Sequence, residues 1–219
     1  MAKYLNMTTE QKVARAFLTI DAVGFVKGEP IRFKSGILSP VYVDNRKLPS
    51  YPKYWKTILN GKKKLINDKK IKFDLIAGIE SAGIPHGAAL GFYLNKPSVF
   101  VRKQEKDHGT KKRVEGGEVK NKRVLLIEDL VTTGSSSLSG VEALRTEGAK
   151  ASDCLVIVSY GFPEAFRAFK KAKVRLHTLV PFPVILKEAV AMKKCTPEQA
   201  ENISQWYKDP WSWTKKMSR

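Results

Sequence analysis

Two adjacent carboxylates, followed by a turn of hydroxyl side chains and glycine, are the residues of this chain best suited to chemistry. Glu128 and Asp129 directly follow four apolar residues, 124–127, and residues 132–137 read TTGSSS. Backbone N–H groups at the start of a helix attract phosphate, and carboxylates bind sugar hydroxyls or a hydrated Mg²⁺. A phosphate cradle beside two acids therefore predicts a phosphorylated sugar as the ligand.

The elements that must position these residues follow from the surrounding pattern. The apolar run 124–127 is typical of a strand buried on both faces of a parallel sheet, and an apolar stripe over residues 135–147 predicts a helix. The acids would then lie just outside the carboxyl end of the strand, where open α/β sheets bind ligands. The alternative is an ordinary strand and N-capped helix with solvated acids. The Walker A and G-x-G-x-x-G motifs are absent from the sequence.

The same alternation of strands and helices runs through the middle of the chain and predicts a Rossmann-like α/β fold with a parallel sheet. The other expected strands are residues 73–77, 98–101, 151–159 and 174–180, and the other expected helices are residues 83–94, 163–171 and 184–192, with one more starting at Thr196. Residues 8–23 predict an amphipathic helix with a Thr8–Gln11 capping box, followed by a hairpin at 25–33 and a strand at 41–43. We expect one domain over residues 1–219, with a small hood or lid at about 1–48, a core sheet at about 73–180 and C-terminal helices at 181–219.

The basic segment 102–123 shows no apolar periodicity and is long for a connection in a compact domain. Arg102, Lys103, Lys106 and His108 cluster near its start, and Gly116 with Gly117 offers a hinge. A cationic flap of this kind would neutralise a departing pyrophosphate and exclude water while a sugar cation develops. A solvated basic hairpin without a ligand is the alternative.

The net charge of +19 permits nucleic acid binding, but the positive charge is concentrated in two segments, residues 53–72 and the basic segment 102–123. Residues 53–72 also carry an apolar stripe, so we interpret their lysines as the solvated side of a helix. No nucleic acid partner is therefore expected. No membrane partner is expected either, because no apolar run reaches membrane-spanning length and residues 1–12 lack the core of a signal peptide. With only two, widely separated cysteines, Cys154 and Cys195, the chain is expected in the reduced cytoplasm.

A third feature is the Gly/Pro-broken loop at residues 32–46, RFKSGILSPVYVDNR, which carries Lys34 and aromatic residues. It would suit a flat anionic base held by stacking and N–H donors, and an ordinary hairpin turn is the alternative. Three motifs thus occur in order: F-K-S-G with S-P-x-Y, then R-K-x-x-K-x-H-G, then E-D-x-x-T-x-G-S. On these motifs, over about residues 8–180, the chain resembles the orotate phosphoribosyltransferases, a family with the type I phosphoribosyltransferase fold.

The resemblance implies transfer of a 5-phosphoribosyl group from phosphoribosyl pyrophosphate to orotate, giving orotidine 5′-monophosphate and pyrophosphate on the route to UMP. It also implies a homodimer with shared active sites, and Mg²⁺ held mainly by the substrate, with Glu128 and Asp129 reaching it through water and no direct protein ligand. The implied catalytic residues are Lys103, Lys106, His108, Glu128 and Asp129, and the implied substrate-binding residues are Lys34, Tyr42, Val43, Ser81, Ala82, Arg102, Leu130, Val131, Thr132, Thr133, Gly134, Ser135 and Ser136.

Two positions depart from the family pattern. Ala82 stands where many members carry lysine, and Tyr160 stands where many carry the arginine that clamps orotate's carboxylate. These departures leave open a phosphoribosyltransferase for another base. A nucleic-acid-binding regulator that retains the fold is a further alternative, although an intact Lys106-x-His108 flap favours catalysis.

Overall fold

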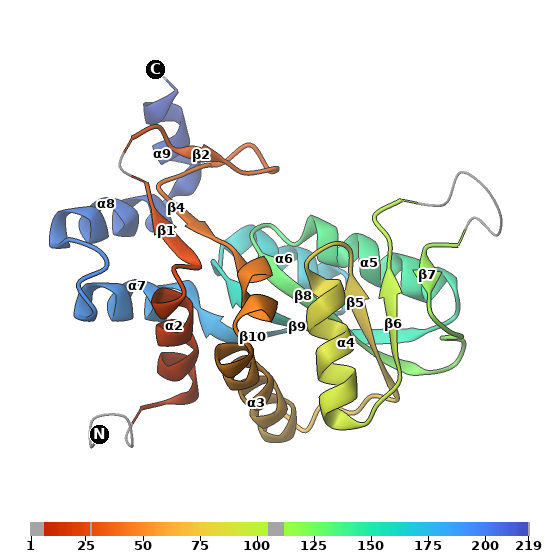
Figure 1. Ribbon diagram of the computed structural model, residues 1–219. Coiled ribbons are helices and arrows are strands. Elements are labelled where there is room, and N and C mark those ends of the chain that lie inside the picture. The colour runs from red at the N-terminus through yellow and green to blue at the C-terminus, as the bar shows by residue number, and fades with distance from the viewer. Residues whose placement is uncertain (1–6, 27, 105–111, 219) are drawn as a thin grey trace. The chain divides into compact units, whose positions relative to one another are not determined.

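The computed structural model describes residues 7–26, 28–104 and 112–218 of the 219-residue chain. The chain divides into two compact units, one of residues 1–54 with 180–219 and one of residues 55–179. The first unit contains short hairpins and helices from both ends of the chain, and the second contains the main sheet (Figure 1). Within the described residues, no helix is both long and apolar enough to cross a membrane.

The second unit is built on a six-stranded sheet in the order β10-β9-β8-β5-β6-β7. The strands are β5 (Leu75–Ile79), β6 (Ser98–Val101), β7 (Val114–Glu115), β8 (Arg123–Val131), β9 (Lys150–Ser159) and β10 (Arg175–Pro181). Strands β6, β5, β8 and β9 pair in parallel, and β7 pairs with β6 in the antiparallel direction. The predicted α/β fold with a mostly parallel sheet is therefore confirmed.

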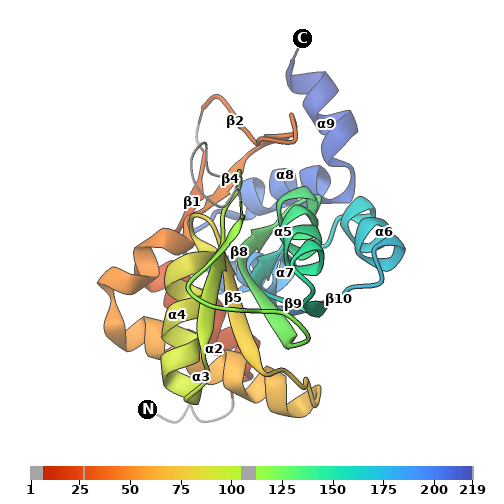
Figure 2. The same ribbon diagram turned by 90° about the vertical axis from the view of Figure 1, so that its right-hand side faces the viewer.

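Helices cover both faces of this sheet, as expected for strands that are apolar on both sides. Helices α3 (Pro52–Asp68) and α4 (Gly83–Leu94) supply one apolar cluster, and α5 (Ser135–Thr146) and α6 (Pro163–Lys171) supply the other. In Figure 2, α4 and α5 lie on opposite sides of β5 and β8. Along β8, Leu125 and Ile127 belong to the α3/α4 cluster, whereas Val124 and Leu126 belong to the α5/α6 cluster. This alternation fixes the face on which each functional side chain of β8 lies.

In the first unit, α2 (Thr9–Thr19) packs against α7 (Phe182–Ala191), where Arg15 donates to the buried Glu188 at 2.6 Å. Strand β1 (Val23–Phe25) pairs with β4 (Val41–Val43), β2 (Ile31–Arg32) pairs with β3 (Leu38–Ser39), and a 3-10 helix, η1 (Asn45–Ser50), follows.

The C-terminal helices α8 (Pro197–Lys208) and α9 (Pro210–Met217) hold β3 from the same unit. The indole N–H of the fully buried Trp206 donates to the Leu38 carbonyl at 2.7 Å, and the Leu38 N–H donates to Thr214 Oγ1 at 2.9 Å. The tryptophan-rich end of the chain thus fixes the strand that follows the Lys34 loop.

Local sequence signals predicted several elements at their observed bounds. Both capping boxes, Thr8 with Gln11 and Thr196 with Gln199, are formed. Two predictions about the N-terminal region were wrong. Helix α2 ends at Thr19 rather than near residue 23, because Val23 pairs with Val43. The hairpin expected at 25–33 does not form, because Phe25 pairs with Val41 and the observed hairpin joins β2 to β3.

Candidate active site

The two carboxylates lie within strand β8 and not beyond its end, which corrects the expectation from sequence. The backbone of β8 pairs with β9 as far as Val131, and Glu128 lies opposite Val156. The acidic side chains therefore do not end the strand. Because side chains alternate along a strand, Asp129 follows Leu125 and Ile127 on the α3/α4 face. Glu128 lies on the opposite face, where its Oε2 accepts a hydrogen bond from Ser137 of α5 at 3.2 Å.

The two acids also differ in burial. Glu128 is 5% exposed, whereas Asp129 is half-buried. Burial, followed by the neighbouring charge of Asp129, raises the pKa of Glu128 well above its usual range. Glu128 Oε1 also accepts a hydrogen bond from the Asp129 N–H at 3.1 Å, so it holds the backbone at that residue. Asp129 is therefore the carboxylate better placed to meet a ligand.

The turn after β8 begins helix α5 as the sequence predicted. Leu130 and Val131 complete the strand, Thr132 and Thr133 are half-buried, and Ser135 and Ser136 are exposed. Gly134 is the N-cap residue with φ of +86°, and within the described residues no side chain caps this end of α5. Its first N–H groups are therefore available to an anion at the carboxyl edge of the sheet.

Gly134 is also required by its surroundings. A Cβ atom at this position would lie 2.6 Å from Cε2 of Phe169 on α6. The glycine therefore provides both the left-handed backbone and the space for the Phe169 ring.

The loops after β5 and β6 reach the same edge of the sheet, because these strands are parallel to β8. Ser81 is exposed and Ala82, the N-cap of α4, is half-buried. A Cβ on Gly83 would lie 2.6 Å from the Ile127 carbonyl oxygen, so α4 starts directly against β8. The Lys103 N–H donates to Glu80 Oε2 at 2.8 Å, which joins the two loops.

Two parts of the basic segment 102–123 pair with each other near Arg102. The Arg102 N–H donates to the Arg113 carbonyl at 2.8 Å, and the Arg102 guanidinium lies 3.6 Å from Glu115 on β7. Strand β7 has only two residues, too few for a recognisable sequence pattern. The Lys103 side chain is exposed. Lys106 and His108 lie outside the described residues.

The other predicted substrate residues belong to the first unit. Lys34 is exposed in the turn between β2 and β3, next to Gly36, whose φ is +92°. On β4, Val43 is buried and Tyr42 is half-buried, and the Tyr42 hydroxyl accepts a hydrogen bond from Arg46 at 2.5 Å.

Two residues of the second unit have surroundings that the sequence did not reveal. Tyr160, directly after β9, is fully buried and stacks on Phe162 with ring centroids 5.5 Å apart. Lys62 was interpreted as part of a solvated helix face, which is wrong, because it is 0% exposed. Among the described residues its Nζ has no hydrogen-bond partner. Burial lowers the pKa of Lys62 to about 7, and the charge of Asp129 acts in the opposite direction.

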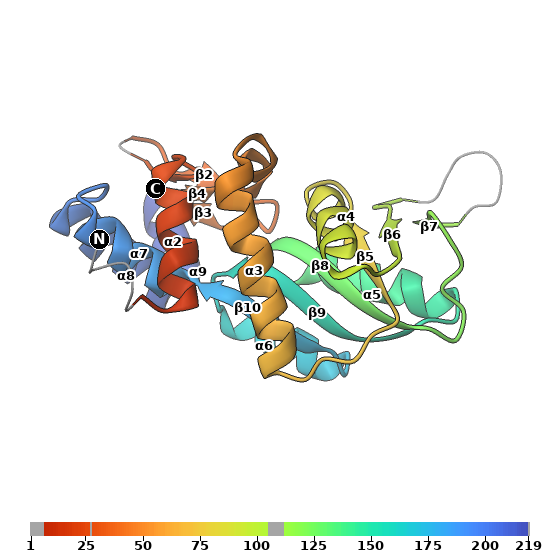
Figure 3. The same cartoon turned by 60° about the horizontal axis from the view of Figure 1, so that its bottom comes forward.

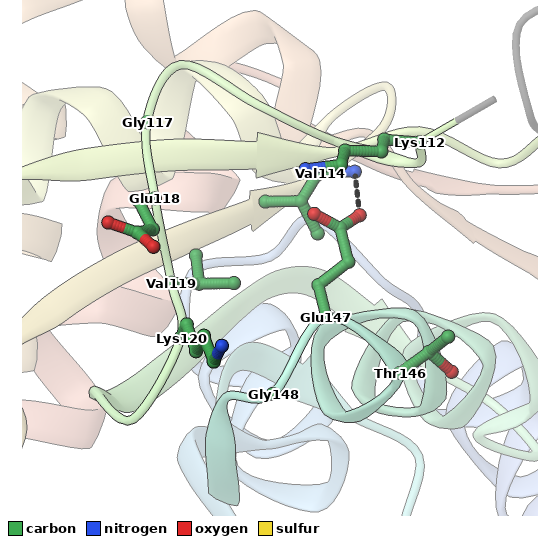
Figure 4. A pocket seen from close by; sticks show the side chains of 9 residues that line it. All are labelled: Lys112, Val114, Gly117, Glu118, Val119, Lys120, Thr146, Glu147 and Gly148. Atoms are coloured by element: carbon green, nitrogen blue, oxygen red, sulfur yellow. Dashed lines mark hydrogen bonds between the residues drawn. The ribbon is translucent and has the colours of Figure 1, made fainter. Parts of the chain in front are cut away.

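A cavity of about 680 Å³ lies elsewhere in the second unit, where the loop after β7 meets the C-terminal end of α5 (Figure 4). Glu147, at its wall, accepts a hydrogen bond from the Val114 N–H at 3.0 Å. None of the candidate site residues lines this cavity, and α5 presents its C-terminal end there, not the N-terminal end that begins at Gly134. Its lining residues are Lys112, Val114, Gly117, Glu118, Val119, Lys120, Thr146, Glu147 and Gly148.

The carboxyl edge of the sheet thus combines a half-buried carboxylate, an uncapped helix start and a cationic loop base. Residues 59–180 match the family of phosphoribosyl transferase domains, in agreement with this site. The fold and the site define a phosphoribosyltransferase.

Full-length relatives narrow the assignment. The chain is 38% identical to the orotate phosphoribosyltransferase of Coxiella burnetii over 95% of its own length and 99% of the relative. It is also 38% identical to that of Cytophaga hutchinsonii over 96% of its length and 100% of the relative. The orotate phosphoribosyltransferase structure from Aeropyrum pernix superposes with a TM-score of 0.72 at 30% identity, covering 80% of this chain and 97% of that one. The chain belongs to the orotate phosphoribosyltransferase family.

Proposed function

We propose that this protein transfers the 5-phosphoribosyl group of phosphoribosyl pyrophosphate to orotate, with release of pyrophosphate, as a step toward UMP. The observation that carries this proposal is the geometry of β8 and α5. Asp129 lies in β8 a few residues before Gly134, and Gly134 begins α5 without a side-chain cap. A carboxylate for ribose hydroxyls beside N–H groups for the 5′-phosphate is the arrangement that this substrate requires.

The proposed roles follow from the chemistry of the substrate. Cleavage at the anomeric carbon develops positive charge on the sugar, which a nearby carboxylate stabilises. Asp129 faces the ribose hydroxyls, Glu128 supports it from the other face of β8, and residues 130–136 wrap the 5′-phosphate. Arg102 and Lys103, together with Lys106 and His108, hold the departing pyrophosphate, to which the Ser81–Ala82 backbone also contributes. Lys34, Tyr42 and Val43 are assigned to the pyrophosphate or the base.

Mg²⁺ is the proposed cofactor. Among the described residues, no group of three or more His, Cys, Asp or Glu side chains could hold a metal ion. The half-buried Asp129 offers oxygen ligands of the kind that Mg²⁺ prefers. This donor set fits an ion carried by the substrate and contacted by the protein through water. When bound, Mg²⁺ would neutralise charge on the pyrophosphate.

The protein is proposed to work as a cytoplasmic homodimer in which the cationic loop serves the partner's site. Mixing inactive Lys103→Ala and Asp129→Asn chains should then restore activity, because one hybrid site receives both wild-type residues. At most about half of the sites in each heterodimer would recover, by two-fold symmetry. Heterodimers that stay inactive would refute the shared site but leave the reaction untouched.

Turnover with a panel of bases tests the reaction itself. Orotate, uracil, hypoxanthine and adenine would each be supplied with phosphoribosyl pyrophosphate and Mg²⁺, and we expect product with orotate alone. The second candidate function is transfer to another base. Two residues favour it: Tyr160 stands at the family's Arg position and Ala82 at its Lys position. Product formed only with a purine would establish that alternative, and no product with any base would exclude both.

A further inference from the structure

Lys62 occupies a core position in helix α3. Residues four apart lie on one face of a helix, and both Ile58 and Ile66 are buried. Leu59 and Leu65 pack against the α3/α4 cluster, whereas the adjacent Lys63 and Lys64 are exposed. The Lys62 side chain therefore lies on the buried face of α3. Figure 3 shows the course of this helix beside the main sheet.

The direction of α3 and the packing of Ile66 indicate that Lys62 lies near Asp129, in agreement with the effect of the Asp129 charge on the Lys62 pKa. Ile66 packs in one cluster with Ile127. The C-terminal end of α3 leads to the amino edge of the sheet, where the Asp74 N–H donates to the Arg123 carbonyl at 2.8 Å. Lys62 precedes Ile66 by four residues, which places it about 6 Å further along α3 toward the carboxyl edge. From Ile127, two residues along β8 rise about 6.6 Å in the same direction. Asp129 also lies on the face of β8 whose residues Leu125 and Ile127 belong to the α3/α4 cluster.

Stability alone does not account for a lysine at this position. Burying an ammonium group without a hydrogen-bond partner is costly, and an apolar side chain of similar size would fill the space at lower cost. The Asp129 charge is the interaction that favours the protonated amino group, because it opposes the effect of burial on the Lys62 pKa. A buried cation beside a ligand-facing carboxylate is typical of functional sites.

We propose that Lys62 is a positioning residue for the transfer reaction, whose buried amino group acts through its charge to favour the orientation of the Asp129 carboxylate that contacts the ribose. This inference rests on the proposed role of Asp129 in binding phosphoribosyl pyrophosphate. The amino group is buried, so in this role it acts on the carboxylate and does not itself touch the substrate. It thereby adds a positive charge to a site in which Ala82 contributes none.

Lys62→Met tests the proposal, because methionine retains the length of the side chain and removes the charge. Lys56→Met is the matched control, since Lys56 is exposed on the same helix. We expect the melting temperature of Lys62→Met to be unchanged or raised. The value of kcat/KM for phosphoribosyl pyrophosphate should fall by about 10- to 100-fold, as for a misplaced catalytic group, while the KM for orotate changes less than about threefold. Lys56→Met should match the wild type in all three measurements.

A double-mutant cycle identifies the partner of the amino group. The dissociation constant of phosphoribosyl pyrophosphate with Mg²⁺ is measured by calorimetry, without a base, for Lys62→Met, Asp129→Asn and the double variant. Each single change should weaken binding, and Lys62→Met should have little further effect in the Asp129→Asn protein. Additive effects would overturn the proposal, as would kinetics within threefold of wild type, or a loss of melting temperature that parallels the loss of activity. The binding measurement contains no base. Its result can therefore be interpreted even if orotate is not the acceptor.

Discussion

Gly134→Ala should damage the site through α6 as well as through the turn that Gly134 forms. The residue has φ of +86°, and an added Cβ would lie 2.6 Å from Cε2 of Phe169, whose ring is 2% exposed. An alanine in the left-handed conformation costs about 1–2 kcal/mol. Overpacking against a buried ring costs about 1–3 kcal/mol more, because the ring is enclosed and has little space to move.

The expected total is therefore about 2–5 kcal/mol of unfolding free energy, or a fall in melting temperature of about 4–20 °C for a chain of this size. Differential scanning calorimetry and urea unfolding measure both quantities. The KM for phosphoribosyl pyrophosphate should rise more than the KM for orotate, because the displaced turn carries the N–H groups assigned to phosphate.

Gly36→Ala is the matched control, because Gly36 has φ of +92° and open space around an added Cβ. It should cost only the backbone term of about 1–2 kcal/mol. Phe169→Leu should recover part of the loss in the Gly134→Ala protein, with a coupling of about 1 kcal/mol or more. If Gly134→Ala is no more destabilising than Gly36→Ala, the argument from the Phe169 contact is refuted.

Three further changes test other parts of the molecule. Asp129→Asn should lower kcat by about 10²–10³-fold without changing the melting temperature, and a change below about threefold would remove the assigned role. Hydrogen bonds from Arg175 and His177 lower the pKa of Asp153 although burial raises it, so this carboxylate stabilises the fold above its unfolded pKa of about 3.8. Asp153→Asn should cost about 3 kcal/mol at pH 7 in urea unfolding and progressively less below pH 4, whereas a cost independent of pH would contradict the ionic contribution. Thr214→Val should cost about 1–3 kcal/mol, because the buried Leu38 N–H loses its acceptor; an unchanged urea midpoint would show that this bond does not hold β3.

The predictable part of the fold is the part that local signals specify. Helices 83–94 and 163–171 and strand 98–101 were predicted at their observed bounds, because their apolar periods and the proline that starts 163–171 are encoded nearby. The pairing of Val23 with Val43 joins residues 20 positions apart and depends on the rest of the first unit, so no local pattern identifies it. The extent of β8 was underestimated for a related reason. The pairing with β9 continues from Glu128 to Val131, although acidic residues disfavour a buried strand.

The candidate site shows the same division. The motif residues of β8 and α5 were found from their types and spacing, because a short motif needs only one strand and one helix. Lys62 was missed because its helix carries exposed lysines on both sides of it in sequence, and only the packing of α3 distinguishes it from them. Periodicity was nevertheless a usable signal, since Lys62 lies four residues from both Ile58 and Ile66.

The different burial of the two carboxylates leads to a last prediction, that Glu128 and Asp129 differ in function. Glu128 is buried against Ser137, and its raised pKa favours the protonated form, which glutamine imitates. Glu128→Gln should therefore keep kcat within about tenfold of wild type, far above Asp129→Asn. A carboxyl group whose pKa is raised by folding loses stability as pH rises above its unfolded value of 4.5. The stability of Glu128→Gln relative to wild type should consequently increase from pH 5 to pH 8 in urea unfolding. If Glu128→Gln is as inactive as Asp129→Asn, both carboxylates act as anions on the substrate and the separation of their roles by burial is wrong.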